Sequence, residues 1–160
     1  MACFGAARQA RRDDRGLGKG IWRRLHDRYR RGLDRFHQDL EGVQDEDLYA
    51  ELLAIADDLS RQLPEVRRCC MAAQREAPTD GMQIPGERLG RMHRYLSKAG
   101  NSLAAAAEAA AMGRLEGERG RPLPGAAGAW RVDSVRRQAA VVLEDVAEAV
   151  RQLEEGAGPR

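Results

Sequence analysis

Two histidines and one cysteine are the residues of this chain best suited to metal chemistry. His26, Cys70 and His93 each lie at the edge of an apolar helical repeat, and Cys69 precedes Cys70. In an antiparallel bundle, at about 1.5 Å per residue, these three positions fall at a similar level near one end. Imidazole nitrogen and thiolate sulfur are ligands of zinc and of haem iron. The spacing therefore predicts a candidate zinc or haem site at His26, Cys70 and His93.

A structural role for the same residues is the preferred interpretation. Free cysteines are often buried as small hydrophobic residues, and a histidine at the edge of an apolar face places its polar tip outward. Three cysteines, two of them adjacent, do not make a disulfide framework. We therefore expect reduced thiols, a cytoplasmic protein and no bound cofactor.

Sequence motifs for catalysis are missing from the chain. It has no glycine-rich phosphate loop, no G-x-S-x-G, no H-E-x-x-H and no C-x-x-C. A carboxylate di-iron bundle needs two Glu-x-x-His pairs, and the chain offers only Asp34-x-x-His37. The sequence thus favours a protein without catalytic residues.

A line of arginines could bind a polyanion. Arg24, Arg28, Arg31 and Arg35 recur at i, i+4, i+7 and i+11, which aligns them on one helix face. We call these four residues the arginine stripe. Residues 1–35 carry eleven basic and four acidic side chains, a balance that suits nucleic-acid phosphates. The alternative is an ordinary solvated face, because the aromatic platforms that grip single strands are missing.

An alanine-rich segment predicts a protein interface. Between Ala99 and Met112 the only charged residue is Glu108. The segment therefore has more apolar surface than a helix with one core-facing side requires. At about 100° per residue, Ala109 lies nearly opposite the apolar face defined by Leu96 and Leu103. We expect a homodimer or a partner helix to contact this side, at Ala105, Ala109 and Met112. The alternative is packing inside the monomer.

Apolar residues at alternating three- and four-residue steps predict four helices. Their expected bounds are 21–41, 46–76, 85–113 and 130–155, with a kink at Pro64 in the second. Residues 1–20 lack an apolar period and are expected to form a disordered basic arm. Glycine and proline predict a flexible linker at 113–128, and residues 157–160 form a tail.

These elements predict an all-α fold, a single four-helix bundle with preferred up-down-up-down topology. Exchange of the last helix between two chains is the alternative that the long linker leaves open. No stretch of eighteen apolar residues is present, so membrane insertion is not expected. The predicted function is non-catalytic protein binding or self-association. Polyanion binding is the second candidate, and zinc or haem binding is the third.

Overall fold

The computed structural model describes residues 2–84, 86–118 and 125–158 of the chain. Within these residues there are five α-helices and no strand, so the predicted all-α class is confirmed. The helices are α1 (Ala2–Leu17), α2 (Ile21–Glu41), α3 (Glu46–Glu76), α4 (Glu87–Glu118) and α5 (Gly125–Gly156).

Local sequence signals account for the two best-predicted helices. The apolar residues of α2 that recur every three or four positions are all buried, namely Trp22, Leu25, Tyr29, Leu33, Phe36 and Leu40. At the start of α3 the side chain of Asp45 accepts a hydrogen bond from the backbone N–H of Leu48 at 2.8 Å. Glu46 and Asp47 add negative charge at the positive end of the helix dipole. The helix then continues through Pro64.

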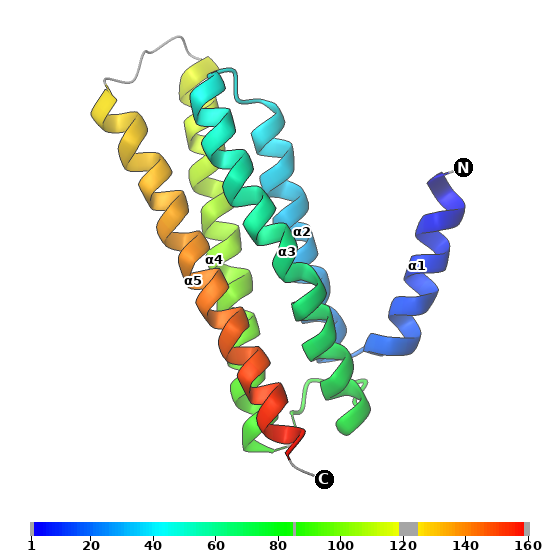
Figure 1. Ribbon diagram of the computed structural model, residues 1–160. Coiled ribbons are helices and arrows are strands. Elements are labelled where there is room, and N and C mark those ends of the chain that lie inside the picture. Colours follow the sequence, from blue (N-terminus) through cyan, green and yellow to red (C-terminus); the bar gives the residue numbers. More distant parts are fainter. Residues whose placement is uncertain (1, 85, 119–124, 159–160) are drawn as a thin grey trace.

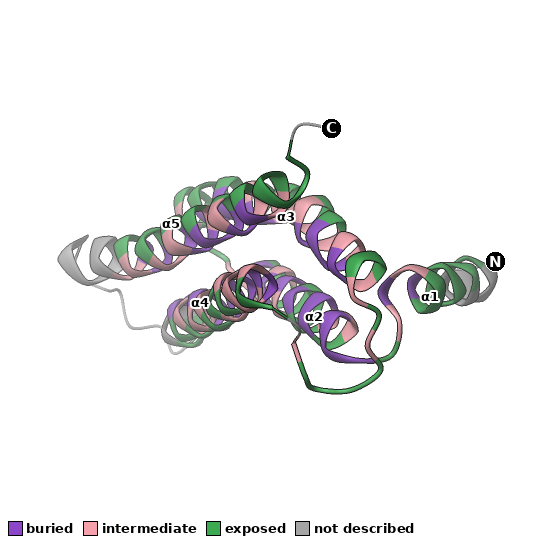
Figure 2. Ribbon diagram, turned by 90° about the horizontal axis from the view of Figure 1, so that it is seen from below, coloured by how far each residue is buried: buried purple, intermediate pink, exposed green. Residues whose placement is uncertain are grey.

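The four long helices alternate in direction (Figure 1). Seen from below they form two layers, α3 with α5 and α2 with α4 (Figure 2). Each helix packs on two neighbours, whereas α2 and α5 lie at opposite corners, as do α3 and α4. The chain therefore passes from α3 to α4 between diagonal corners of the bundle, and helices within a layer run parallel.

Polar contacts fix the register of the antiparallel pair α4 and α5. The ammonium group of Lys98 lies 3.3 Å from a carboxylate oxygen of Asp145. Seven residues earlier in α4, Arg91 Nε donates to Gln152 Oε1 at 2.8 Å, and Gln152 lies seven residues later in α5. Both contacts belong to the same register along the pair.

The connection between α4 and α5 is shorter than predicted. The glycines and prolines at 113–128 predicted a linker, but α4 extends to Glu118 and α5 begins at Gly125. Arg114 donates to Glu118 at 2.9 Å, an (i, i+4) pair that supports the last turn of α4. The remaining residues of the predicted linker, 119–124, lie outside the described residues.

The N-terminal segment contains a further helix. Residues 2–17 form α1, and the disordered arm expected from the sequence stays a prediction. Alanine, arginine and glutamine are good helix formers, and Gln9 donates to Asp13 one turn later at 2.9 Å. The segment lacks an apolar period because α1 buries only two of its described side chains, Asp13 and Leu17.

None of the described helices is long and apolar enough to cross a membrane.

Candidate interaction surfaces

The residues of the candidate metal site make separate contacts. His26 Nδ1 lies 3.2 Å from a carboxylate oxygen of Asp27. The ring of His93 packs edge-on against Trp22, with ring centroids 6.0 Å apart. Cys70 is completely buried. In the described part of the chain, no three His, Cys, Asp or Glu side chains are grouped so that they could hold a metal ion.

Burial disfavours the charged form of each of these groups. It lowers the pKa of His26, although Asp27 acts in the opposite direction. Burial also lowers the pKa of His93, and the nearby Arg94 adds to this effect. The pKa of the Cys69 thiol is raised to about 11 by burial, and that of Cys70 is also raised. Thiols in this state are poor nucleophiles and poor metal ligands at neutral pH.

The half-motif Asp34-x-x-His37 is also used structurally. His37 Nε2 lies within hydrogen-bond distance of the Ser60 hydroxyl, at 3.1 Å. The Ser60 hydroxyl in turn donates to the carbonyl of Ala56 at 2.7 Å. His37 therefore links α2 to α3.

All four residues of the arginine stripe are exposed. Arg24 contacts the sulfur of Met82 at 2.7 Å, and Arg28 donates to the side chain of Asn101. Arg31 and Arg35 form no ion pair with any residue that the structure describes. The second half of the stripe therefore keeps its positive charge uncompensated by direct pairing.

Much of the alanine-rich segment is covered within the monomer. Ala106, Ala107 and Ala110 are buried, Ala105 and Ala109 are half-buried, and Ala104, Glu108 and Met112 are exposed, Met112 at 59%. Ala109 is half-covered although it lies nearly opposite the apolar face of Leu96 and Leu103, because α4 packs against both α2 and α5.

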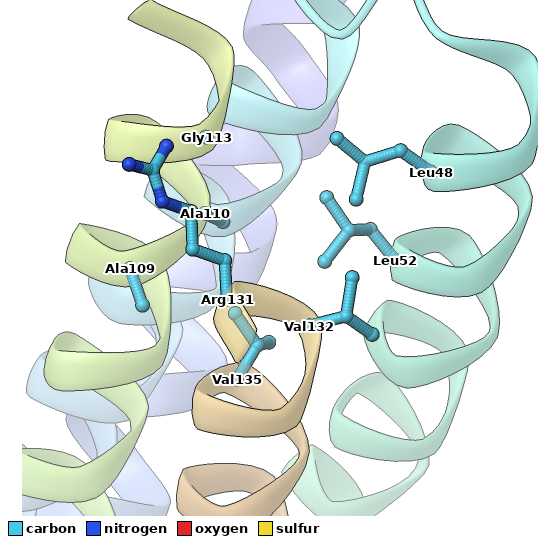
Figure 3. A pocket seen from close by; sticks show the side chains of 8 residues that line it. All are labelled: Leu48, Leu52, Ala109, Ala110, Gly113, Arg131, Val132 and Val135. Carbon is cyan, nitrogen blue, oxygen red and sulfur yellow. The ribbon is translucent and has the colours of Figure 1, made fainter. Parts of the chain in front are cut away.

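Ala109 borders a small apolar pocket (Figure 3). Ala109, Ala110 and Gly113 of α4 face side chains of α3 and α5 across it, namely Leu48, Leu52, Arg131, Val132 and Val135. The pocket has room for about one water molecule. It is therefore a packing defect near the top of the bundle, too small for a ligand.

A larger open groove lies between the parallel helices α3 and α5, and sequence reasoning missed it. It encloses about 580 Å³ and its apolar lining consists of Ala50, Ala54, Ile55, Ala139, Ala140 and Leu143. Glu51 and Asp58 on α3 and Arg136 on α5 complete the lining. Arg136 forms an ion pair with Glu51 at 2.6 Å, which links the two walls. We call this surface the α3–α5 groove.

The sequence contains one weak indication of the α3–α5 groove. Ala50, Ala54 and Ala140 stand at outward positions, where a solvated helix usually carries polar side chains. Nothing in the sequence placed α3 beside α5, because the two helices are separated by α4 in the chain. The groove could therefore be recognised only once the neighbours were known.

A buried charged group lies where α1 meets α2 and α3. Asp13 is only 1% exposed and forms an ion pair with Arg67 of α3. Burial alone would raise the pKa of Asp13, but hydrogen bonds from Arg67 and Gln9 lower it overall. On the same side of α1, Asp14 pairs with Arg23 of α2 at 2.7 Å.

Comparison of the chain with protein families, with curated proteins and with solved structures finds no match. We therefore base the function on the geometry of the α3–α5 groove and of the arginine stripe.

Proposed function

We propose that this chain is a non-catalytic, up-down-up-down four-helix bundle that forms a homodimer through the α3–α5 groove. The observation that supports this proposal is the groove itself, an open apolar surface with opposite charges on its two walls. A homodimer interface around a two-fold axis must be self-complementary.

The shape of the groove suits a helical occupant. Alanine at positions 50, 54 and 140 allows the backbone of a second helix to come close. The helices α3 and α5 have 31 and 32 residues, or about 45 Å at 1.5 Å per residue. Two helices of that length offer enough surface for the roughly 800 Å² per partner that a stable interface buries.

The charges of the groove favour one arrangement of two copies. Both of its acidic residues, Glu51 and Asp58, lie on α3, and its single arginine, Arg136, lies on α5. A two-fold axis parallel to the helices sets α3 of one subunit against α5 of the other. Glu51 then faces the partner subunit's Arg136. An axis across the helices would instead set α3 against α3, and the acidic walls would repel each other.

Light scattering across a hundredfold dilution tests the proposed dimer. We expect the parent chain to have twice the monomer mass and Ala140→Arg to be monomeric with an unchanged helical signal. An arginine in a tight alanine contact brings overpacking and an unpaired charge. Ala104→Arg is the matched control, because Ala104 is exposed on α4, away from the groove. A monomeric parent, or a dimer that tolerates Arg at 140, overturns the proposal.

Charge exchange tests the orientation. Arg136→Glu places three acidic residues in the groove and should weaken the dimer at least about tenfold. Combining Arg136→Glu with Glu51→Arg exchanges the charges of the walls and should restore association. If neither the single nor the double variant changes the affinity of the dimer, the dimer does not form through the α3–α5 groove.

Polyanion binding through the arginine stripe is a second candidate function. It is supported by the exposed positions of Arg31 and Arg35, neither of which has an ion-pair partner among the described residues. The double variant Arg31→Gln, Arg35→Gln should lower the affinity for DNA or RNA. The slope of log affinity against log salt concentration should become shallower by about two, because two phosphate contacts are lost. The control is Arg61→Gln with Arg68→Gln, because these arginines pair with Asp58 and Glu65. If the parent chain shows no salt-sensitive binding to DNA or RNA at low salt, this candidate function is rejected.

A further inference from the structure

We propose that α1 is a displaceable helix, and that the surface beneath it binds a partner helix carrying an acidic residue followed four positions later by leucine. That surface is formed by Arg23 and His26 of α2 and by Arg67, Met71 and Gln74 of α3, and we call it the α1 socket. The proposal is independent of the α3–α5 groove.

The described side chains of α1 contact the bundle in its C-terminal half. Figure 1 shows that α1 reaches the other helices only near its end, while its N-terminal part stands apart. Residues 8–12 are all exposed, and the buried ones among the described side chains of α1 are Asp13 and Leu17. An element held by so few buried groups is expected to open locally far more often than the bundle unfolds.

The α1 socket is nevertheless specific in its geometry. Asp13, Gly16 and Gly18 lie against Arg67, Met71 and Gln74, which share one face of α3. A Cβ atom at Gly16 would lie 2.8 Å from the Met71 methyl group, so the α1 backbone comes close to α3. Gly18 adopts a positive φ of 66° and ends the helix.

The chemistry of the α1 socket defines the ligand that it takes. The guanidinium of Arg67 binds the Asp13 carboxylate, and Leu17, one helical turn later, is completely buried. A charge-assisted hydrogen bond and one buried aliphatic side chain fix both the position and the direction of a helix. Another helix with a carboxylate and a leucine at this spacing can make the same contacts.

The bundle is held together without α1. Tyr29 donates to the carbonyl of Leu59 at 2.9 Å, and His37 contacts Ser60 at 3.1 Å, so α2 and α3 are joined by their own hydrogen bonds. Gly18, with its positive φ, and the exposed Lys19 make a short hinge. Displacement of α1 therefore exposes the socket while the core of α2–α5 stays packed.

The test uses the full chain with the substitutions Asp13→Asn and Leu17→Ala, which remove the two buried contacts of α1. We call this variant the released chain. The probe is a labelled peptide of residues 2–17. Fluorescence anisotropy should show binding to the released chain at least about tenfold tighter than to the parent, whose own α1 competes. A peptide with the same two substitutions should not bind. Equal binding to parent and released chain, or no binding to a released chain that retains its helical signal, overturns the proposal.

Two variants of the released chain locate the site. Arg67→Gln should abolish peptide binding, whereas Arg68→Gln should leave it unchanged, because Arg68 is exposed and pairs with Glu65. Peptide binding that survives Arg67→Gln overturns the assignment to the α1 socket. A released chain that doubles its mass would assign the socket to α1 of a second copy and overturn the assignment to a separate partner.

Hydrogen exchange of the parent chain tests the local opening of α1 even if the released chain does not fold. The amides of residues 8–17 should exchange at least about tenfold faster than those in the middle of α2. Equal protection of α1 and α2 would show that α1 opens only with the whole bundle, and the proposal would fail.

Discussion

Asp13 of α1 and Arg67 of α3 form an ion pair whose carboxylate is almost completely buried, while the side chain of Arg67 is partly exposed. A buried charge depends on its partner, because an unpaired carboxylate in an apolar setting costs several kcal/mol. In the displaced state that we propose, α1 lies in water and the carboxylate avoids that cost. On this proposal the strength of the pair determines how often α1 leaves the bundle rather than how stable the bundle is.

Acid should weaken the folded state around His26. Burial lowers the pKa of His26 below its ordinary value of 6.5, so the folded chain binds a proton less readily than the unfolded chain. Stability is highest above pH 6.5 and is lost as the pH falls from that value towards the lower pKa of the folded state. The charged or titratable groups near the ring are Asp13 of α1, Asp27 of α2, and Arg67 and Cys70 of α3.

Urea denaturation between pH 8 and pH 5 measures this dependence. The midpoint of unfolding should fall with acid in the parent chain and fall less in His26→Gln. His37→Gln is the control, because His37 is only partly buried and its ring contacts a neutral hydroxyl, that of Ser60. A parent midpoint that is flat over this range contradicts the expectation.

Gly113→Ala should stabilise the protein by about 0.5 to 1 kcal/mol. Glycine inside a helix is less favourable than alanine by about that amount, because it loses more backbone freedom on folding. A Cβ at this position would meet nothing within 4 Å and would project beside the small pocket of Figure 3. Thermal or chemical denaturation provides the measurement, and a loss of stability would contradict this view of the pocket.

Ala109→Arg should destabilise the monomer by about 1 to 3 kcal/mol. The side chain would have to fit among Val132, Val135 and Ala110, where the space is close to that of one water molecule. Glu108→Arg is the control, because Glu108 is the exposed neighbour on the same helix. If the two variants are equally stable, then α5 does not cover Ala109 in solution.

Gly20→Ala should also destabilise the protein, by about 1 to 3 kcal/mol. Its Cβ would lie 2.5 Å from the carbonyl oxygen of Thr79, which is backbone and cannot rotate away. The same loop accepts a hydrogen bond from the backbone N–H of Ile21 at Gly81, with a length of 3.2 Å. Gly90→Ala, whose Cβ meets only the far end of Arg94 at 3.9 Å, should be neutral or stabilising.

The sequence predicted single helices well and their neighbours poorly. The bounds of α2 and α3 could be predicted because a helical period, Gly42 and the cap at Asp45 are all local signals. The exposure of Ala109 could not, because it depends on α5 lying against α4. Periodicity shows which face of a helix is apolar but gives no information on how many helices cover it.

The candidate sites, too, were predicted well where they depend on one helix and poorly where they depend on several. The arginine stripe is exposed as expected, since a charged face at helical spacing is a property of one element. Grouping of His26, Cys70 and His93 required three helices in a particular rotation, and instead His93 packs on Trp22. Asp13 gave no signal at all, because an aspartate in an arginine-rich segment is ordinarily solvated.

The diagonal placement of α3 and α4 has a consequence for the order of folding. It divides the bundle into two antiparallel hairpins, α2 with α3 and α4 with α5, each formed from helices adjacent in sequence. Contacts between the hairpins, such as Arg28 with Asn101, join residues 73 positions apart. Local contacts form fastest, so we expect the hairpins to form first and to dock in a slower step. Lengthening the 77–86 segment should then slow refolding only slightly, because doubling a loop costs about 0.6 kcal/mol of closure entropy.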